Sequence, residues 1–158
     1  MTQKEKQELW IAICGYLPHG VIFDYNEQIV YGFDWLNIQN QILTITNRFS
    51  TSIEEVRPYL RPISKMTNKE KDKLLTKLVG KKYKNLFKVR SDGRVVEVDD
   101  RTKKTWDSVD GIHFEYVDFC PNTIKTYMEF MYSHHLDIHG LIKKGLALEA
   151  TKEMYETT

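Results

Sequence analysis

The sequence has few of the features that mark a secreted, membrane-embedded or metal-bound protein. Its 158 residues include only two cysteines and eight glycines. No apolar run approaches the ~20 residues that a membrane-spanning helix needs, and the first residues lack the apolar core of a signal peptide. We therefore expect a cytoplasmic protein with no membrane partner. Its length predicts a single domain over 1–158, divided at most into units 1–63 and 64–158.

Known catalytic signatures are also missing from the sequence. The glycines are scattered, so neither glycine-rich phosphate-binding motif occurs, and there is no nucleophile elbow or zinc-protease helix motif. Cys14 and Cys120 have mainly apolar neighbours and no second cysteine or histidine at metal-ligand spacing, which predicts two buried, reduced thiols. We predict no catalytic residues and no cofactor, and the sequence favours a protein that is not an enzyme.

Apolar periodicity and turn residues predict an α+β fold. Thr2 and Glu5 form a capping box before an N-terminal helix, which Gly15 and Pro18 should end. Four short strands should follow, which indicates a small SH3-like antiparallel barrel or a twisted sheet. The predicted strands cover 21–25, 29–33, 42–46 and 53–56, with a turn at Asn26-Glu27 and a connection over 34–41.

The remaining sequence predicts a basic helix, a hairpin and a C-terminal strand–helix–helix. Thr67 and Glu70 form a second capping box, ahead of a helix over 68–79 that Gly80 should end. Asp92-Gly93 indicates a tight hairpin turn between strands over 86–90 and 94–98. The last predicted elements are a strand over 112–117, a helix over 123–134 capped by Asn122, and a short helix over 138–144 capped by Asp137.

Charge is strongly segregated along the chain. The segment 57–104 holds 16 Lys and Arg against six Asp and Glu, a net charge of +10, whereas the whole chain carries only +1. A lysine ridge of this kind contacts phosphates without reading sequence, and interleaved Tyr83 and Phe87 could stack on bases. A solvated face or a surface for a protein partner would look the same. The candidate nucleic-acid-binding residues are Lys69, Lys73, Lys77, Lys81, Lys82, Lys84, Lys88, Arg90 and Arg94.

A histidine cluster near the C-terminus is the alternative candidate site. His134, His135, Asp137 and His139 are residue types that bind transition metals. Adjacent side chains on one backbone diverge, however, and Asp137 is expected to cap a helix. We predict that the cluster is structural and holds no metal. A small metal-dependent hydrolase at this cluster stays open as the alternative.

Two segments resemble a known group of proteins. Residues 58–67 read PYLRPISKMT, and residues 134–150 read HHLDIHGLIKKGLALEA. These patterns are similar to those of small uncharacterised proteins encoded by phages, prophages and mobile elements of gut anaerobic bacteria. The chain departs from them at His139, Thr151 and Glu153, where the group has arginine, proline and glycine. The resemblance implies a genetic origin and no specific activity.

Three functions follow from the sequence as hypotheses. The first is a non-catalytic accessory or interaction protein of phage or mobile-element origin with an unidentified protein partner. The second is nucleic-acid binding through the basic segment 65–104. The third is the metal-dependent hydrolase at the histidine cluster.

Overall fold

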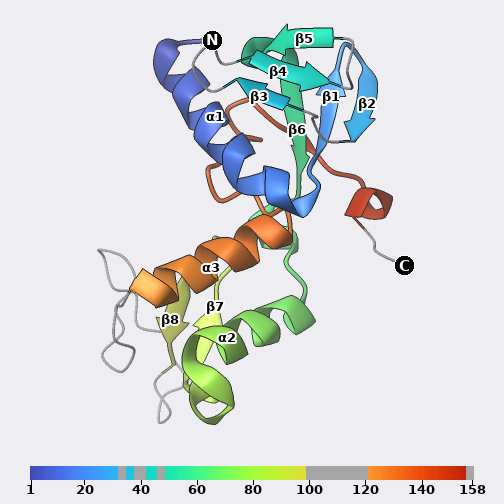
Figure 1. Ribbon diagram of the computed structural model, residues 1–158. Helices are drawn as coiled ribbons and strands as arrows, with labels where there is room; N and C mark the ends of the chain where they lie inside the picture. Colours follow the sequence, from blue (N-terminus) through green and yellow to red (C-terminus); the bar gives the residue numbers. More distant parts are fainter. Residues whose placement is uncertain (32–34, 38–41, 46–48, 99–120, 156–158) are drawn as a thin grey trace. The chain divides into compact units, whose positions relative to one another are not determined.

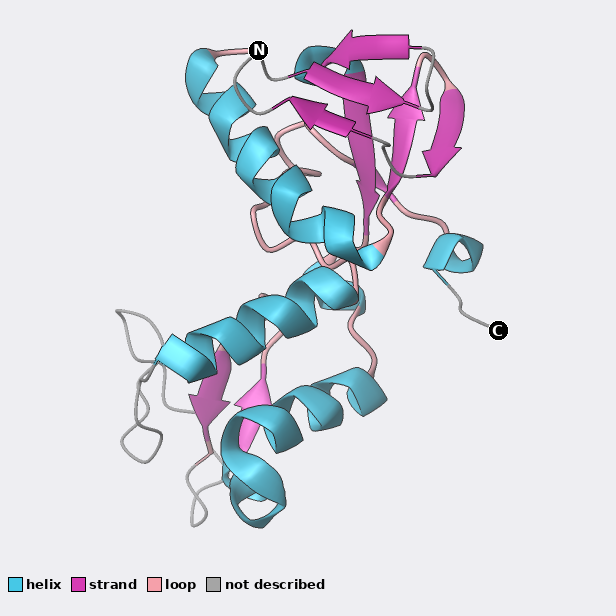
Figure 2. Ribbon diagram, viewed as in Figure 1, coloured by secondary structure: helices cyan, strands magenta, loops and turns pink. Residues whose placement is uncertain are grey.

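The structure, a computed structural model, describes residues 1–31, 35–37, 42–45, 49–98 and 121–155. It has an α+β fold that divides into two compact units (Figures 1 and 2). Met1–Pro62 and Tyr132–Thr158 together form one, which we call the split unit. Ile63–Met131 forms the other, which we call the central unit. The chain thus leaves the split unit, builds the central unit and returns.

The split unit begins with α1 (Gln3–Tyr16), followed by the short 3₁₀ helix η1 (Leu17–His19). The predicted capping box is confirmed, because the Thr2 hydroxyl accepts the Glu5 N–H at 3.2 Å while the Glu5 carboxylate accepts the Thr2 N–H at 2.7 Å. The prediction that Gly15 ends the helix is wrong. This glycine lies inside α1, where an added Cβ would stand 2.4 Å from the Tyr132 ring, so it permits close packing.

A mixed four-stranded sheet forms the centre of the split unit. It has the order β2-β1-β6-β9, in which β1, β2 and β6 are antiparallel neighbours and β9 runs parallel to β6. The predicted turn at Asn26-Glu27 is confirmed, because both residues have positive φ, 49° and 64°, as a type I′ hairpin requires. The strands are β1 (Ile22–Tyr25), β2 (Gln28–Tyr31), β6 (Val56–Leu60) and β9 (Leu148–Glu149).

A second, antiparallel sheet has the order β3-β4-β5, with β3 (Trp35–Asn37), β4 (Ile42–Ile45) and β5 (Phe49–Ser52). The connection predicted over 34–41 therefore contains a strand. The strand predicted over 53–56 is instead the 3₁₀ helix η2 (Ile53–Glu55), which Ser52 caps by accepting the Glu54 N–H. In the described part of the chain these strands form separate open sheets, so the SH3-like barrel is not confirmed.

The core of the split unit joins residues from both pieces of its chain. Leu9 and Ile13 of α1 pack with Phe23 of β1, and Leu141 and Leu146 come from the C-terminal piece. All five are buried. Burial of each such side chain stabilises a fold by about 1.5–3 kcal/mol, so neither piece has a complete core without the other.

Backbone hydrogen bonds fasten the returning chain beside Arg61. The Arg61 N–H donates to the His135 carbonyl at 2.7 Å, and its carbonyl accepts the Asp137 N–H at 2.9 Å. The helix predicted over 138–144 is wrong, because Gly140 adopts a left-handed φ of 64° and the segment forms turns. The buried Asp137 carboxylate still caps these turns by accepting the N–H groups of Leu141 and Ile142 at 2.8 and 2.9 Å.

The C-terminal 3₁₀ helix η5 (Lys152–Tyr155) docks onto the split unit through Tyr155. The Tyr155 hydroxyl accepts the Ile22 N–H at 2.9 Å and donates to the Tyr59 carbonyl at 2.7 Å. It therefore joins β1 and β6 through a side chain. The Tyr155 ring stacks on His135, with ring centroids 3.7 Å apart.

The central unit combines two α-helices with a hairpin. α2 (Asn68–Tyr83) begins at the predicted Thr67 and Glu70 capping box, which is confirmed. α3 (Pro121–Ser133), whose last two residues are counted with the split unit, begins before Asn122, so the predicted Asn122 cap is wrong. The unit also contains the 3₁₀ helices η3 (Ile63–Lys65) and η4 (Lys84–Leu86) and the strands β7 (Phe87–Val89) and β8 (Val95–Glu97). The strand predicted over 112–117 lies outside the described residues.

Two expectations about the whole chain concern cysteines and membranes. Cys14 is exposed on α1, so the predicted burial of this thiol is wrong, and Cys120 lies outside the described residues. None of the helices that the structure describes has the length and apolar character needed to cross a membrane.

The predicted hairpin at Asp92-Gly93 is present and tightly packed. β7 and β8 are antiparallel, and the Gly93 N–H donates to the Arg90 carbonyl at 3.1 Å across the turn. Gly93 has a φ of 86°, and the Tyr127 hydroxyl donates to its carbonyl at 3.1 Å. An added Cβ would lie 3.0 Å from Ile63 and 3.2 Å from the Tyr127 hydroxyl.

We expect Gly93→Val to destabilise the protein by at least about 1 kcal/mol, because a β-branched residue resists positive φ and its Cβ is crowded. Urea unfolding, read as a lower midpoint, measures the effect. Ser91→Val, at an exposed position of the same turn, is the control and should change stability by no more than about 0.5 kcal/mol. Equal midpoints for the wild type and Gly93→Val would contradict the expectation.

Candidate functional site

The lysine ridge on α2 arises from the spacing of its residues. Lys69, Lys73 and Lys77 recur every four residues, and each step advances about 6 Å along a helix. All three are exposed, whereas Leu74 and Leu75 are buried. The helix therefore turns its leucines toward the interior of the central unit and its lysines toward the solvent.

A kink at Gly80 brings lysines that follow it close to the first part of α2. Gly80 has φ 78° and ψ 161°, a conformation that is essentially restricted to glycine. It ends the regular helix, as predicted, but a further helical turn continues to Tyr83. The chain after the kink turns back, so that Lys84 reaches Asp72 in the first part of α2.

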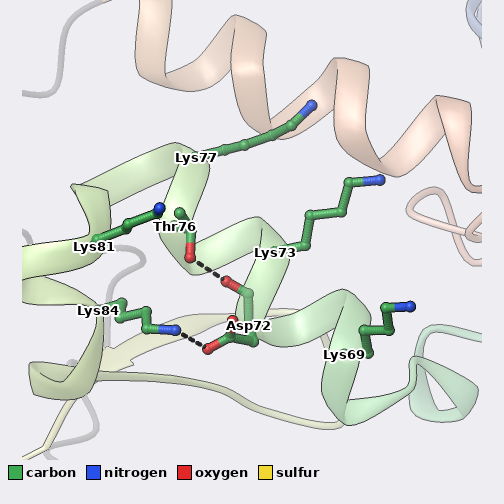
Figure 3. Close-up of a pocket in the computed structure, with 7 residues that line it drawn as sticks. All are labelled: Lys69, Asp72, Lys73, Thr76, Lys77, Lys81 and Lys84. Atoms are coloured by element: carbon green, nitrogen blue, oxygen red, sulfur yellow. Dashed lines mark hydrogen bonds and ion pairs between the residues drawn. The ribbon is translucent and has the colours of Figure 1, made fainter.

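These residues surround a hollow of about 450 Å³, which we call the lysine groove (Figure 3). Lys69, Lys73 and Lys77 extend from α2 in one general direction, and Lys84 approaches Asp72 from the other side. Five lysines and one aspartate contribute to the lining of the hollow. Its lining residues are Lys69, Asp72, Lys73, Thr76, Lys77, Lys81 and Lys84.

Most of the positive charge in the lysine groove is not neutralised by the protein. Lys84 pairs with Asp72, with 2.6 Å between its ammonium nitrogen and the carboxylate oxygen. Lys69, Lys73 and Lys81 form no ion pair with any residue that the structure describes. The Lys77 ammonium lies 6.0 Å from the centre of the Phe130 ring. The groove therefore carries positive charge that no described residue compensates.

The structure brings together five of the nine basic residues predicted as a binding site. The other four lie elsewhere: the Lys82 ammonium covers the Tyr83 ring at 5.1 Å, and Lys88 is exposed on β7. Arg90 and Arg94 flank the hairpin turn, with their Nε atoms 4.0 and 3.5 Å from the Asp92 carboxylate.

Two lining residues, Asp72 and Thr76, were missed by sequence analysis. Asp72 and Lys73 follow Lys69 by three and four residues, and Thr76 follows Asp72 by four, so all share one helix face. Helical spacing alone could have identified them. The Thr76 hydroxyl donates to the Asp72 backbone carbonyl at 2.8 Å, whereas the Asp72 carboxylate is the negative charge that an incoming anion meets.

The side chains of the histidine cluster each have a partner within the split unit. His134 bonds the Ser133 hydroxyl at 3.1 Å, and His139 bonds the Tyr132 hydroxyl at 3.0 Å. Asp137 caps the turns that follow it. Within the described ranges, no group of three or more His, Cys, Asp or Glu residues is placed to hold a metal ion.

His135 is the most constrained residue of the cluster. It has a positive φ of 53°, is buried, and donates from Nε2 to the His19 carbonyl at 2.8 Å. Burial lowers the pKa of His135 from 6.5 to about 4, although the bond to His19 acts in the opposite direction. The imidazole is therefore neutral at pH 7. It donates a hydrogen bond to His19 of η1 and stacks on the Tyr155 ring.

Comparisons with protein-family models, curated proteins and solved structures give no match to this chain. The chemistry of the lysine groove therefore rests on its own residues. Lysine ammonium groups are hydrogen-bond donors and point charges that suit phosphate oxygens.

The state of His135 predicts a loss of stability in acid. Between pH 6.5 and about 4 the unfolded chain binds a proton at His135 that the folded chain does not, so the free energy of unfolding falls as pH falls through this window. The full loss is roughly 3 kcal/mol. We expect thermal denaturation across this pH range to show a steeper decline for the wild type than for His135→Asn.

Asparagine is the suitable replacement because it tolerates positive φ and does not titrate. His134→Asn, at the neighbouring position, is the control and should decline as the wild type does. Parallel stability curves for the wild type and His135→Asn would rule out a buried neutral imidazole as the cause.

Proposed function

We propose that this protein is a non-catalytic interaction protein that binds nucleic acid by its phosphates in the lysine groove. The observation that carries the proposal is that five lysines line one hollow, with Asp72 as the single acidic residue among the described residues of its lining. Unpaired ammonium groups release counterions from a polyanion when they contact phosphates, and this gain is independent of base sequence.

The arrangement of charge favours a phosphate backbone over a single small anion. The four-residue spacing of Lys69, Lys73 and Lys77 forms a row about 12 Å long, whereas one phosphate could contact only part of it. A chain of phosphates can occupy the whole row. No cofactor or catalytic residue is part of the proposal.

The genetic origin of the protein is a separate proposal. We propose a phage or mobile-element protein acting in the bacterial cytoplasm, on the resemblance of residues 58–67 and 134–150 alone. The lysine groove neither requires this origin nor depends on it.

Binding should weaken steeply with salt, with a log–log slope of about −0.9 per phosphate neutralised on duplex DNA and about −0.7 on single strands. We expect the variant Lys69→Gln, Lys73→Gln, Lys77→Gln to flatten that slope by about two to three units, because each substitution leaves one phosphate without its ammonium partner. Fluorescence anisotropy with a labelled 20-mer over a salt series measures it.

The control variant is Lys4→Gln, Lys125→Gln, Lys143→Gln, which removes the same charge from exposed positions outside the groove. It should keep the wild-type slope to within about one unit. If duplex and single-stranded DNA both fail to bind at ~50 mM salt and micromolar protein, the proposed function is wrong.

The Asp72 carboxylate should lower the affinity of the groove for nucleic acid. Asp72→Asn removes the carboxylate from the groove and releases Lys84 from its ion pair, so we expect affinity to rise by up to about five-fold, the range of a single exposed charge pair. Glu129→Gln, which removes an exposed carboxylate of α3 that pairs with Lys125, is the matched control. Weaker binding by Asp72→Asn would mean that the ligand does not enter the groove.

A further inference from the structure

An exposed aromatic residue lies in the same short segment of sequence as two lysines of the groove. Tyr83 is the last residue of α2 and lies between Lys81 and Lys84, which both line the groove. Its exposed fraction is 48%, whereas Phe87, the other aromatic residue of the basic segment, is only 6% exposed. Tyr83 is thus available to a ligand and Phe87 is not.

The surroundings of Tyr83 match a nucleotide in both of its parts. The Lys82 ammonium lies over the Tyr83 ring, 5.1 Å from its centre, so a positive charge and an aromatic ring occur together in this segment. A nucleotide likewise carries its negative phosphate next to a flat base. Leu86, 37% exposed, adds apolar surface in the same segment.

We infer that the lysine groove selects single-stranded over duplex nucleic acid, with one base stacked on Tyr83; the inference rests on the proposed function. In a duplex the bases are stacked on each other and cannot reach a protein ring, but the bases of a single strand can. Stacking accepts any base, so this preference needs no sequence reading.

The size of the groove supports the same choice. A volume of about 450 Å³ is that of a small-ligand pocket. A short stretch of one backbone is closer to this size than the body of a duplex. A duplex could contact only the ends of the lysines, whereas a single strand is narrow enough to lie along the groove.

The test uses a labelled mixed-sequence 20-mer, alone and annealed to its complement, in anisotropy titrations at ~50 mM salt. We expect the single strand to bind more tightly. Tyr83→Ala should weaken single-strand binding by roughly 5- to 150-fold, the effect of losing one stacked base, and leave duplex binding and both salt slopes unchanged. Tyr83→Trp should retain single-strand binding.

Tyr31→Ala is the matched control, because Tyr31 is 79% exposed but belongs to the split unit. It should leave single-strand binding unchanged. Duplex binding at least as tight as single-strand binding, or equal loss of both in Tyr83→Ala, would overturn the inference while leaving the proposed function in place. If neither nucleic acid binds the wild type, both fail.

Discussion

The split unit depends on the hydrogen bonds that Arg61 exchanges with the returning chain. Its N–H and carbonyl bond the backbones of His135 and Asp137, on either side of Leu136. This contact sets the position of the C-terminal piece, and the Asp137 carboxylate then orders the turns that carry Leu141 into the core. Backbone groups buried without partners are costly. These two hydrogen bonds therefore give partners to backbone groups of both segments. Loss of the contact would leave the backbone groups of both segments without partners.

The lysine groove requires a helix that tolerates repulsion between like charges. Lysines four residues apart destabilise a helix by about 0.2–0.5 kcal/mol per pair. Burial of Leu74 and Leu75 contributes about 1.5–3 kcal/mol each, and the Thr67–Glu70 capping box adds more. Packing and capping therefore outweigh repulsion by a wide margin. The uncompensated charge persists in the folded protein, so an anion that neutralises it also stabilises α2.

Most of the features that sequence analysis identified correctly are local, and several of those it missed depend on residues far apart in the sequence. The Thr67 capping box needs only two residues three apart, so a reading of the chain finds it. The role of Gly15 depends on Tyr132, more than a hundred residues away, and a glycine in isolation indicates a helix end. Asp137 was correctly predicted to cap the segment that follows it. That segment forms turns and not a helix, because Gly140 has a left-handed φ. At the candidate site, four-residue spacing predicted the α2 lysines, whereas the kink at Gly80 decided which later lysines would join them.

The discontinuity of the split unit fixes an order of events at the ribosome. Its first 62 residues are made well before the piece that begins at Tyr132, and the intervening central unit is continuous in sequence. At about 5–20 residues per second, synthesis of those roughly 70 residues takes about 4 to 14 s. During that interval the N-terminal strands lack Leu141, Leu146 and the closing contact at Arg61. The central unit can complete its fold first, so the split unit, although its larger piece is made earlier, is completed after it.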